Sequence, residues 1–120
     1  MNLKKLFDQK ANLPVNDASV ASHYITDPSN TNQASVQVNI QNQGTQTLSN
    51  IPVQVTTPAG TTMLNVASLA PSAVRSFELP LPNDAFDNPA GFTIDTRIKY
   101  SDDVQRNDTR QTIYLPSNSH

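Results

Sequence analysis

Residues 36–55 read VQVNIQNQGTQTLSNIPVQV, two runs in which apolar and polar side chains alternate, joined by a polar connection. Alternation with a period of two is typical of a β-strand that buries one face and exposes the other to water. The connection begins with Asn42, Gln43 and Gly44, a composition that favours a turn. The stretch therefore predicts two strands of an antiparallel sheet. Its buried face is expected to carry Val36, Val38, Ile40, Ile51, Val53 and Val55.

The composition of the whole chain also favours strands and turns over helices. Its 120 residues include nine Asp but a single Glu, and Asn and Gln together number 22. Thr and Val favour strands and Asn and Asp favour turns, whereas Glu and Lys favour helices. A chain of this length has room for one domain with its own core. We therefore expect a single all-β domain.

Turn residues divide the chain into seven short runs. Proline and glycine mark turns at 27–30, 58–60 and 69–72, and a proline-rich segment at 80–89 predicts a long irregular connection. Seven short strands at even spacing are typical of an immunoglobulin-like β-sandwich. The expected strands are 19–26, 35–42, 51–57, 61–66, 74–79, 92–100 and 111–115. The later strands are expected to add Phe77, Phe92, Ile94 and Ile98 to the core.

Several short motifs follow one another in a definite order. They are Asn-Gln-Gly after an alternating strand, Pro-Val-x-Val, Leu-Ala-Pro-Ser before a strand with Phe77, Gly-Phe-Thr-Ile-x-Thr-x-Ile, and a turn from Asp-Asp to Asn-Asp. In this order the chain resembles CARDB-like bacterial domains of the immunoglobulin type. The motifs occupy residues 36–44, 52–55, 69–72, 91–98 and 102–108, and the resemblance spans about residues 15–116. It implies a seven-stranded sandwich used for adhesion, spacing or binding, without enzymatic activity, in a family whose members usually sit as repeats in long exported proteins.

The first 14 residues differ from the rest, so we divide the chain into an N-terminal arm (1–14), a sandwich (15–116) and a C-terminal tail (117–120). Apolar residues at 3, 6 and 7 have the spacing of a weakly amphipathic helical turn, which is too short to be stable alone. The arm is either a frayed terminus or a docking peptide that orders on a partner. The residues assigned to partner binding are Leu3, Lys4, Lys5, Leu6 and Phe7.

The start of the chain is only partly similar to a signal peptide. Leu6 and Phe7 are followed at once by Asp8, Gln9 and Lys10, so the apolar core of about 7–15 residues that an export signal needs does not develop. No stretch approaches the roughly 20 apolar residues of a membrane helix. We therefore expect neither a standard export signal nor insertion into a membrane.

Charge and cysteine content exclude several kinds of partner and site. The net charge is −2 and the four Arg are scattered, so no basic stripe is present to bind phosphates, and nucleic acid is not expected. The chain has no Cys, which excludes a disulfide, a thiolate nucleophile and a Cys-based zinc site.

The residues available for catalysis are few. The two histidines are His23, in the first expected strand, and the terminal His120. Val20, Ser22 and Tyr24 share one face of that strand, so His23 is expected to face outward, opposite Tyr24. A catalytic site needs several such groups to converge. We therefore expect no enzymatic activity, no catalytic residues and no cofactor.

The turn Asp102-Asp103-x-x-x-Asn107-Asp108 is the one cluster of possible metal ligands. Calcium takes six to eight oxygen ligands, and this turn could supply some of them. Its spacing does not match an EF-hand loop, and Asp and Asn are also the best turn residues. We therefore predict no metal site, and a calcium site stays open as the alternative.

Three functions remain. The first is a virion accessory, such as a bacteriophage capsid or tail decoration protein, which would dock on a larger protein assembly through the N-terminal arm. The second is an adhesion or spacer module at a bacterial cell surface or outside the cell, as the resemblance implies. The third is a carbohydrate-binding module, which the absence of Trp and the expected burial of the aromatic residues disfavour. The first function is preferred and predicts a virion location.

Overall fold

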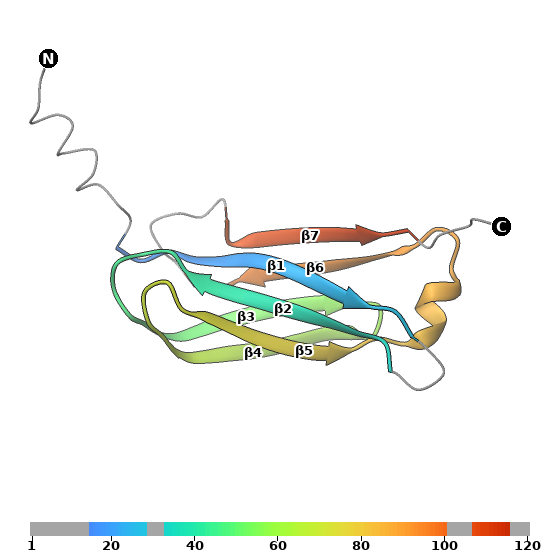
Figure 1. The fold of residues 1–120 in the computed structure, drawn as a ribbon, viewed down its shortest axis with the longest axis horizontal. Coiled ribbons are helices and arrows are strands. Elements are labelled where there is room, and N and C mark those ends of the chain that lie inside the picture. Colours follow the sequence, from blue (N-terminus) through green and yellow to red (C-terminus); the bar gives the residue numbers. More distant parts are fainter. Residues whose placement is uncertain (1–14, 29–32, 101–106, 116–120) are drawn as a thin grey trace, which may run out of the picture.

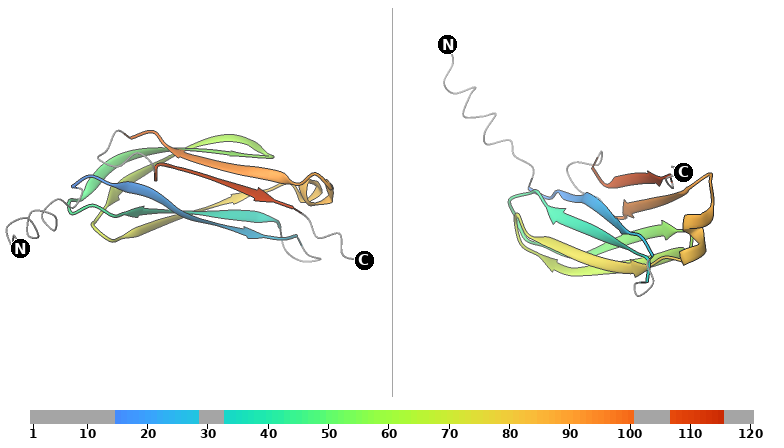
Figure 2. Two further views of the ribbon diagram at one scale, coloured as in Figure 1. Left: turned by 90° about the horizontal axis from the view of Figure 1, so that it is seen from above. Right: turned by 45° about the vertical axis from the view of Figure 1, so that its right-hand side comes forward.

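The computed structural model describes residues 15–28, 33–100 and 107–115, which form a sandwich of two antiparallel sheets (Figures 1 and 2). The sheets have the strand orders β1-β2-β5 and β4-β3-β6-β7. The elements are β1 (Ala18–Thr26), β2 (Ser35–Asn42), β3 (Leu48–Thr57), β4 (Gly60–Leu69), β5 (Val74–Pro80), the short 3₁₀ helix η1 (Asn83–Asp87), β6 (Phe92–Ile98) and β7 (Thr109–Tyr114). This architecture confirms the predicted all-β sandwich of seven antiparallel strands.

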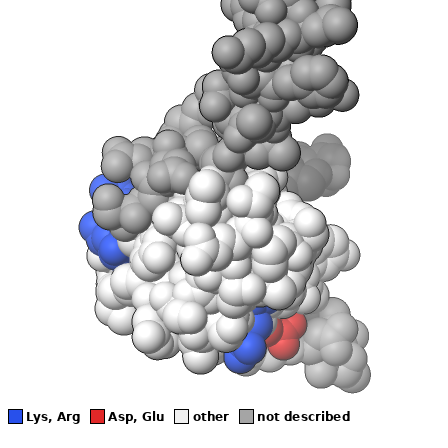
Figure 3. Space-filling model, turned by 90° about the vertical axis from the view of Figure 1, so that its left-hand side faces the viewer, with Lys and Arg blue, Asp and Glu red and all other residues white. Residues whose placement is uncertain are grey.

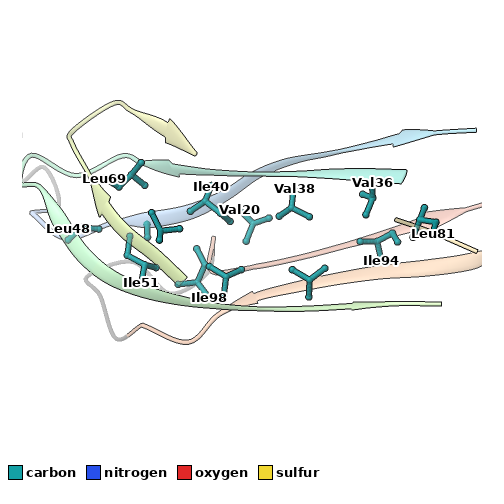
Figure 4. Close-up of a cluster of buried hydrophobic side chains, with 14 of the residues drawn as sticks. Val20, Val36, Val38, Ile40, Leu48, Ile51, Leu69, Leu81, Ile94 and Ile98 are labelled. Atoms are coloured by element: carbon teal, nitrogen blue, oxygen red, sulfur yellow. The ribbon is translucent and has the colours of Figure 1, made fainter. Parts of the chain in front are cut away.

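The core lies between the two sheets (Figure 4). The alternating residues of β2 and β3 are completely buried, as the sequence predicts, and so is Ile94 of β6. Phe77 and Phe92 pack against this core but are only partly buried. The sequence analysis missed several core members. Ala18, Leu48 and Leu69 lie at strand ends, Ala34 and Leu81 lie in loops, and Val66 lies within β4.

The β3–β4 hairpin is longer than predicted. Its ladder runs from Thr57 paired with Gly60 to Leu48 paired with Leu69, so β3 begins earlier and β4 ends later than the alternating pattern indicates. Leu48 and Leu69 are both buried, and their burial accounts for the extension. In contrast, β6 ends at Ile98 rather than at residue 100.

The Asn-Gln-Gly motif closes the connection between β2 and β3. Asn42 is fully buried, and its Nδ2 donates to the carbonyl oxygens of Gln46 at 2.8 Å and Leu69 at 2.9 Å. Its Oδ1 accepts from the backbone N–H of Gly44 at 2.9 Å. A Cβ at Gly44 would collide with the carbonyl oxygen of Val15, so only glycine fits there. The motif is therefore explained by folding alone.

A β-bulge in β1 overturns one prediction about which residues face inward. Val20 pairs with Ile40, but the register shifts between Val20 and Ser22, after which His23 pairs with Val38. Because a bulge inserts one extra residue, the inward set changes from even to odd positions. His23 therefore faces the other sheet instead of solvent, and Tyr24 is 66% exposed rather than buried.

The sequence predicts an irregular connection at residues 80–89, whereas the structure has the short 3₁₀ helix η1 within it. Its Phe86 ring packs edge-on against Phe92 at 5.0 Å and Tyr114 at 5.1 Å between ring centroids. Phe92 and Tyr114 stack on each other at 5.0 Å. This aromatic cluster joins η1 to β6 and β7 at one end of the sandwich (Figure 1).

Candidate functional site

The outer face of the four-stranded sheet carries a shallow hollow of about 430 Å³. The pairing of the strands explains which residues line this hollow. On each strand the buried residues point toward the core, and the residues between them point to the outer face of the sheet. Strands β3, β6 and β7 contribute the lining residues Gln54, Thr56, Thr93, Asp95, Arg97 and Gln111.

The hollow presents hydrogen-bonding groups and no aromatic ring. Arg97 Nε donates to Asp95 Oδ1 at 3.0 Å, and the Arg97 side chain is about half exposed whereas Asp95 is mostly covered. Amide and hydroxyl groups on the neighbouring strands supply both donors and acceptors. Such a surface can bind a neutral polar ligand, but it lacks a nucleophile and a base held in contact with each other.

A second polar cluster joins the two sheets where β1 lies against β6 and β7. His23 Nε2 lies 2.7 Å from Thr96 Oγ1, and His23 Nδ1 lies 2.8 Å from Thr112 Oγ1. Both ring nitrogens are therefore occupied by hydroxyl groups of the opposite sheet, and Thr96 is completely buried. This arrangement makes His23 a cross-link between sheets rather than an exposed residue.

The surroundings of His23 keep its ring neutral. Burial is the largest cause and the positive Arg110 the second, and together, against a partial opposing effect of the Asp95 carboxylate, they lower the pKa of His23 from its ordinary value of 6.5 to about 4. Both ring nitrogens bond to threonine hydroxyls, whereas the histidine of a catalytic triad bonds to a carboxylate, so the cluster differs from a triad.

Arg110 of β7 extends the same junction to the bulge in β1. Its Nη2 donates to the carbonyl oxygen of Ala21 at 2.9 Å, and its Nε donates to that of Val20 at 3.3 Å. The backbone N–H of Val20 donates to the carbonyl oxygen of Asn107 at 3.0 Å. The extra residue of the bulge thus finds hydrogen-bond partners on the opposite sheet.

The predicted turn of possible calcium ligands lies only partly within the described residues, because Asp102 and Asp103 fall outside them. Asn107 Nδ2 donates to Asp17 Oδ1 at 2.8 Å and to Gln43 Oε1 at 3.3 Å, and Asp108 is buried. In the described part of the chain, no three His, Asp or Glu side chains are grouped so that they could hold a metal ion. The absence of a metal site stays a prediction.

The residues assigned to partner binding, Leu3, Lys4, Lys5, Leu6 and Phe7, lie outside the described residues, as does the tail at 117–120. Their role stays a prediction. No helix within residues 15–28, 33–100 and 107–115 is long and apolar enough to cross a membrane.

A solved structure has the same fold. It is the solution NMR structure of a domain from Methanosarcina acetivorans that is described as part of a cell surface protein. The two share 14% sequence identity with a TM-score of 0.68, over 88% of this chain and 96% of that domain. No protein-family model matches the chain, and no curated protein sequence matches it. At this identity the likeness establishes the fold.

Proposed function

We propose that this chain is a non-enzymatic immunoglobulin-type module that acts as a spacer or adhesion element at a cell surface, as CARDB-like domains do. The observation that carries the proposal is the shared fold with the Methanosarcina acetivorans domain, which extends over almost the whole of both chains. That domain is described as part of a cell surface protein, and the likeness favours a cell-surface location over the virion location preferred from sequence.

The course of the chain supports a role as a spacer. The described residues begin near one end of the sandwich, before β1, and finish at the opposite end, after β7 (Figure 1). A domain that the chain enters at one end and leaves at the other adds its full length to the distance between its neighbours. The sandwich between these two ends is held by a continuous core, which makes the spacer stiff.

The chemistry of the described residues supports a role without catalysis. His23 bonds to two hydroxyl groups, and the outer-face hollow holds one exposed ion pair among amides and hydroxyls. None of these groups forms the nucleophile and base pair, or the pair of carboxylates, that hydrolytic enzymes use.

Surface labelling of the organism that encodes the chain tests the proposal. An antibody against the purified domain should label intact cells, and an added protease should remove that label while a cytoplasmic marker protein stays intact. Label that is absent from intact cells and copurifies with virus particles would contradict the proposal and restore the virion accessory role. In that case, deletion of residues 2–13 should abolish attachment to the particles without unfolding the sandwich.

Carbohydrate binding is a second candidate function, because the outer-face hollow offers an Arg, an Asp and several amides and hydroxyls together. These are the groups that hydrogen-bond to sugar hydroxyls. Binding to a glycan array that is lost in Arg97→Ala and kept in Arg75→Ala, on the other sheet, would support it. An array without a signal would contradict it.

A further inference from the structure

Strand β4 forms one edge of the four-stranded sheet and is largely exposed. Its ladder partner is β3, and within the described residues no strand pairs with its other side. Most of its residues are exposed, and only Val66 and Leu69 are buried. The edge therefore presents a row of backbone N–H and C=O groups to solvent.

The composition of β4 makes this edge suitable for pairing. The strand GTTMLNVASL has no charged residue and no proline, and all of its residues except Ala67 pair with β3 in one constant register. It lies within residues 28–74, which contain no Asp, Glu, Lys, Arg or His. The end of the sandwich formed by the β2–β3 and β4–β5 connections shows the same property, since its charged side chains lie only near the margin of the view (Figure 3).

The other three edges carry features that oppose pairing. Strand β5 has Arg75, Glu78 and Pro80. Strand β1 is interrupted by the bulge, and carbonyl groups at that bulge already accept hydrogen bonds from Arg110. Strand β7 is short and carries Arg110 itself. Charges, prolines and bulges are the devices that keep sheet edges from associating, and β4 has none of them.

We propose that β4 pairs with β4 of a second copy of this chain, antiparallel and about a twofold axis, so that two four-stranded sheets form one continuous sheet. A strand that pairs antiparallel with itself is automatically self-complementary, because each residue that contacts a partner residue is contacted by the same residue in return. The two residues of each pair also lie on the same face of the sheet.

The side chains of β4 fit this arrangement. Met63 and Asn65 point to the outer face and are exposed, Met63 by 58%, whereas Leu64 and Val66 point toward the core. Over residues 60–66, where the two faces alternate strictly, outer residues meet outer residues and inner residues meet inner ones in any register about the twofold axis. No like charges meet, because the strand has none. A strand of another protein could also pair with this edge. However, β4 carries no charged side chain that would select such a strand, whereas a second copy of β4 is complementary to it by symmetry.

The interface is small, so we expect weak association that depends on concentration. Modules held close together at a surface would gain from high effective concentration, although the proposal does not depend on the cellular location. Sedimentation velocity of the full chain from about 10 µM to 1 mM should show a monomer that converts to a dimer.

Lysine substitution tests the edge. Met63→Lys should abolish the dimer at every concentration, because it places two positive charges at the seam. The matched control is Val74→Lys, which adds the same charge to the exposed edge strand β5 and should leave the dimer unchanged. Circular dichroism must show that both variants keep the fold. A monomer at all concentrations, or a dimer that survives Met63→Lys, would overturn the proposal.

The absence of cysteine allows a second test that does not depend on charge. Single cysteines at Thr61, Met63, Asn65 and Ala67 can be oxidised one at a time in the otherwise unchanged chain. Twofold pairing predicts that cross-linked dimer is concentrated at the position nearest the axis, or at the two positions that flank it, and that Val74→Cys gives no cross-link. Equal cross-linking at all five positions would indicate random collisions and would overturn the proposal.

Discussion

The two sides of the sandwich, where the edge strands of the two sheets lie next to each other, differ in how they are held together. Where β1 meets β6 and β7, the sheets are joined by hydrogen bonds from His23 to two threonines and from Arg110 to two carbonyl groups. Where β4 meets β5, β4 is uncharged and exposes most of its residues. One side is thus held by polar groups that depend on charge and pH, and the other leaves a neutral edge open.

This difference shows how one fold can serve two needs. Polar cross-links between sheets fix the position of β1 despite its bulge and occupy the backbone groups that the bulge leaves exposed. An edge without such cross-links keeps its backbone groups available to another strand. Four predictions test the comparison, from the largest expected effect to the smallest.

Both sides of the sandwich depend on the same hydrophobic core, so a charge buried in that core should unfold the domain and remove both sides together. Val38→Asp and Ile94→Asp each place an unpaired carboxylate at a fully buried position and should unfold the domain. Thermal melts followed by circular dichroism measure this effect. Gln54→Asp, on the outer face of the same sheet as Ile94, is the control and should melt close to the unsubstituted protein. A native-like melt for Val38→Asp or Ile94→Asp would show that the strand faces are assigned wrongly.

Loss of the arginine cross-link should weaken the β1–β7 side. Arg110→Met keeps much of the apolar stem but removes both hydrogen bonds to the bulge, at a cost of about 1–3 kcal/mol in the free energy of unfolding. Urea titration measures this loss. The same substitution at Arg97, whose ion pair with Asp95 is exposed, should change stability by less than about 1 kcal/mol. Equal losses of stability in Arg110→Met and Arg97→Met would show that the hydrogen bonds of Arg110 to the bulge do not stabilise the β1–β7 side.

The histidine cross-link should make this side sensitive to acid. The pKa of His23 is about 4 in the folded protein and near 6.5 when unfolded, so the unfolded state binds a proton first as the pH falls. Stability should therefore decrease from pH 6.5 to pH 4 and show no further loss from this group below pH 4. His23→Gln retains a donor and an acceptor but cannot titrate, so its melting temperature should depend less on pH in this range. If the melting temperatures of His23→Gln and the unsubstituted protein depended on pH to the same extent, His23 would not be the group responsible for the acid sensitivity.

The smallest effect is expected from calcium. With Asp102, Asp103 and Asp108 acting as turn residues, millimolar calcium should leave the melting temperature almost unchanged. A rise of several degrees that disappears in Asp103→Ala would reveal a calcium site, since a ligand bound to the native state stabilises it. Magnesium at the same concentration is the control for ionic strength.

Local pattern was sufficient for most of the fold. Alternation in β2, β3 and β6 predicts the buried faces correctly, because side chains of a strand alternate between its two faces whatever lies beyond it. The pattern also predicts seven strands in a sandwich, since each strand is bounded by turn residues. It also predicts that the chain has no catalytic site, and this stays a prediction.

The errors of the sequence analysis share a cause. His23 was expected to face outward and Tyr24 inward because simple alternation was continued through Val20, whereas the bulge reverses the pattern after that residue. The residues around the bulge do not indicate it by themselves. The groups that stabilise it belong to Arg110, about 90 residues further along the chain, which donates hydrogen bonds to the carbonyl oxygens at the bulge. The aromatic cluster around Phe86 likewise depends on η1 meeting β6 and β7.

The sequence by itself determined the strands, the buried faces of β2, β3 and β6, the Asn-Gln-Gly turn and the absence of charge along residues 28–74. These properties depend on neighbouring residues and on the two-residue period of a strand. Only the tertiary structure decided that β4 is an open edge, that β1 changes its face at a bulge, and that His23 is held neutral between two threonines. The order of strands in a sheet, and the partners of a buried polar group, are set by contacts between distant segments, and local alternation does not encode them.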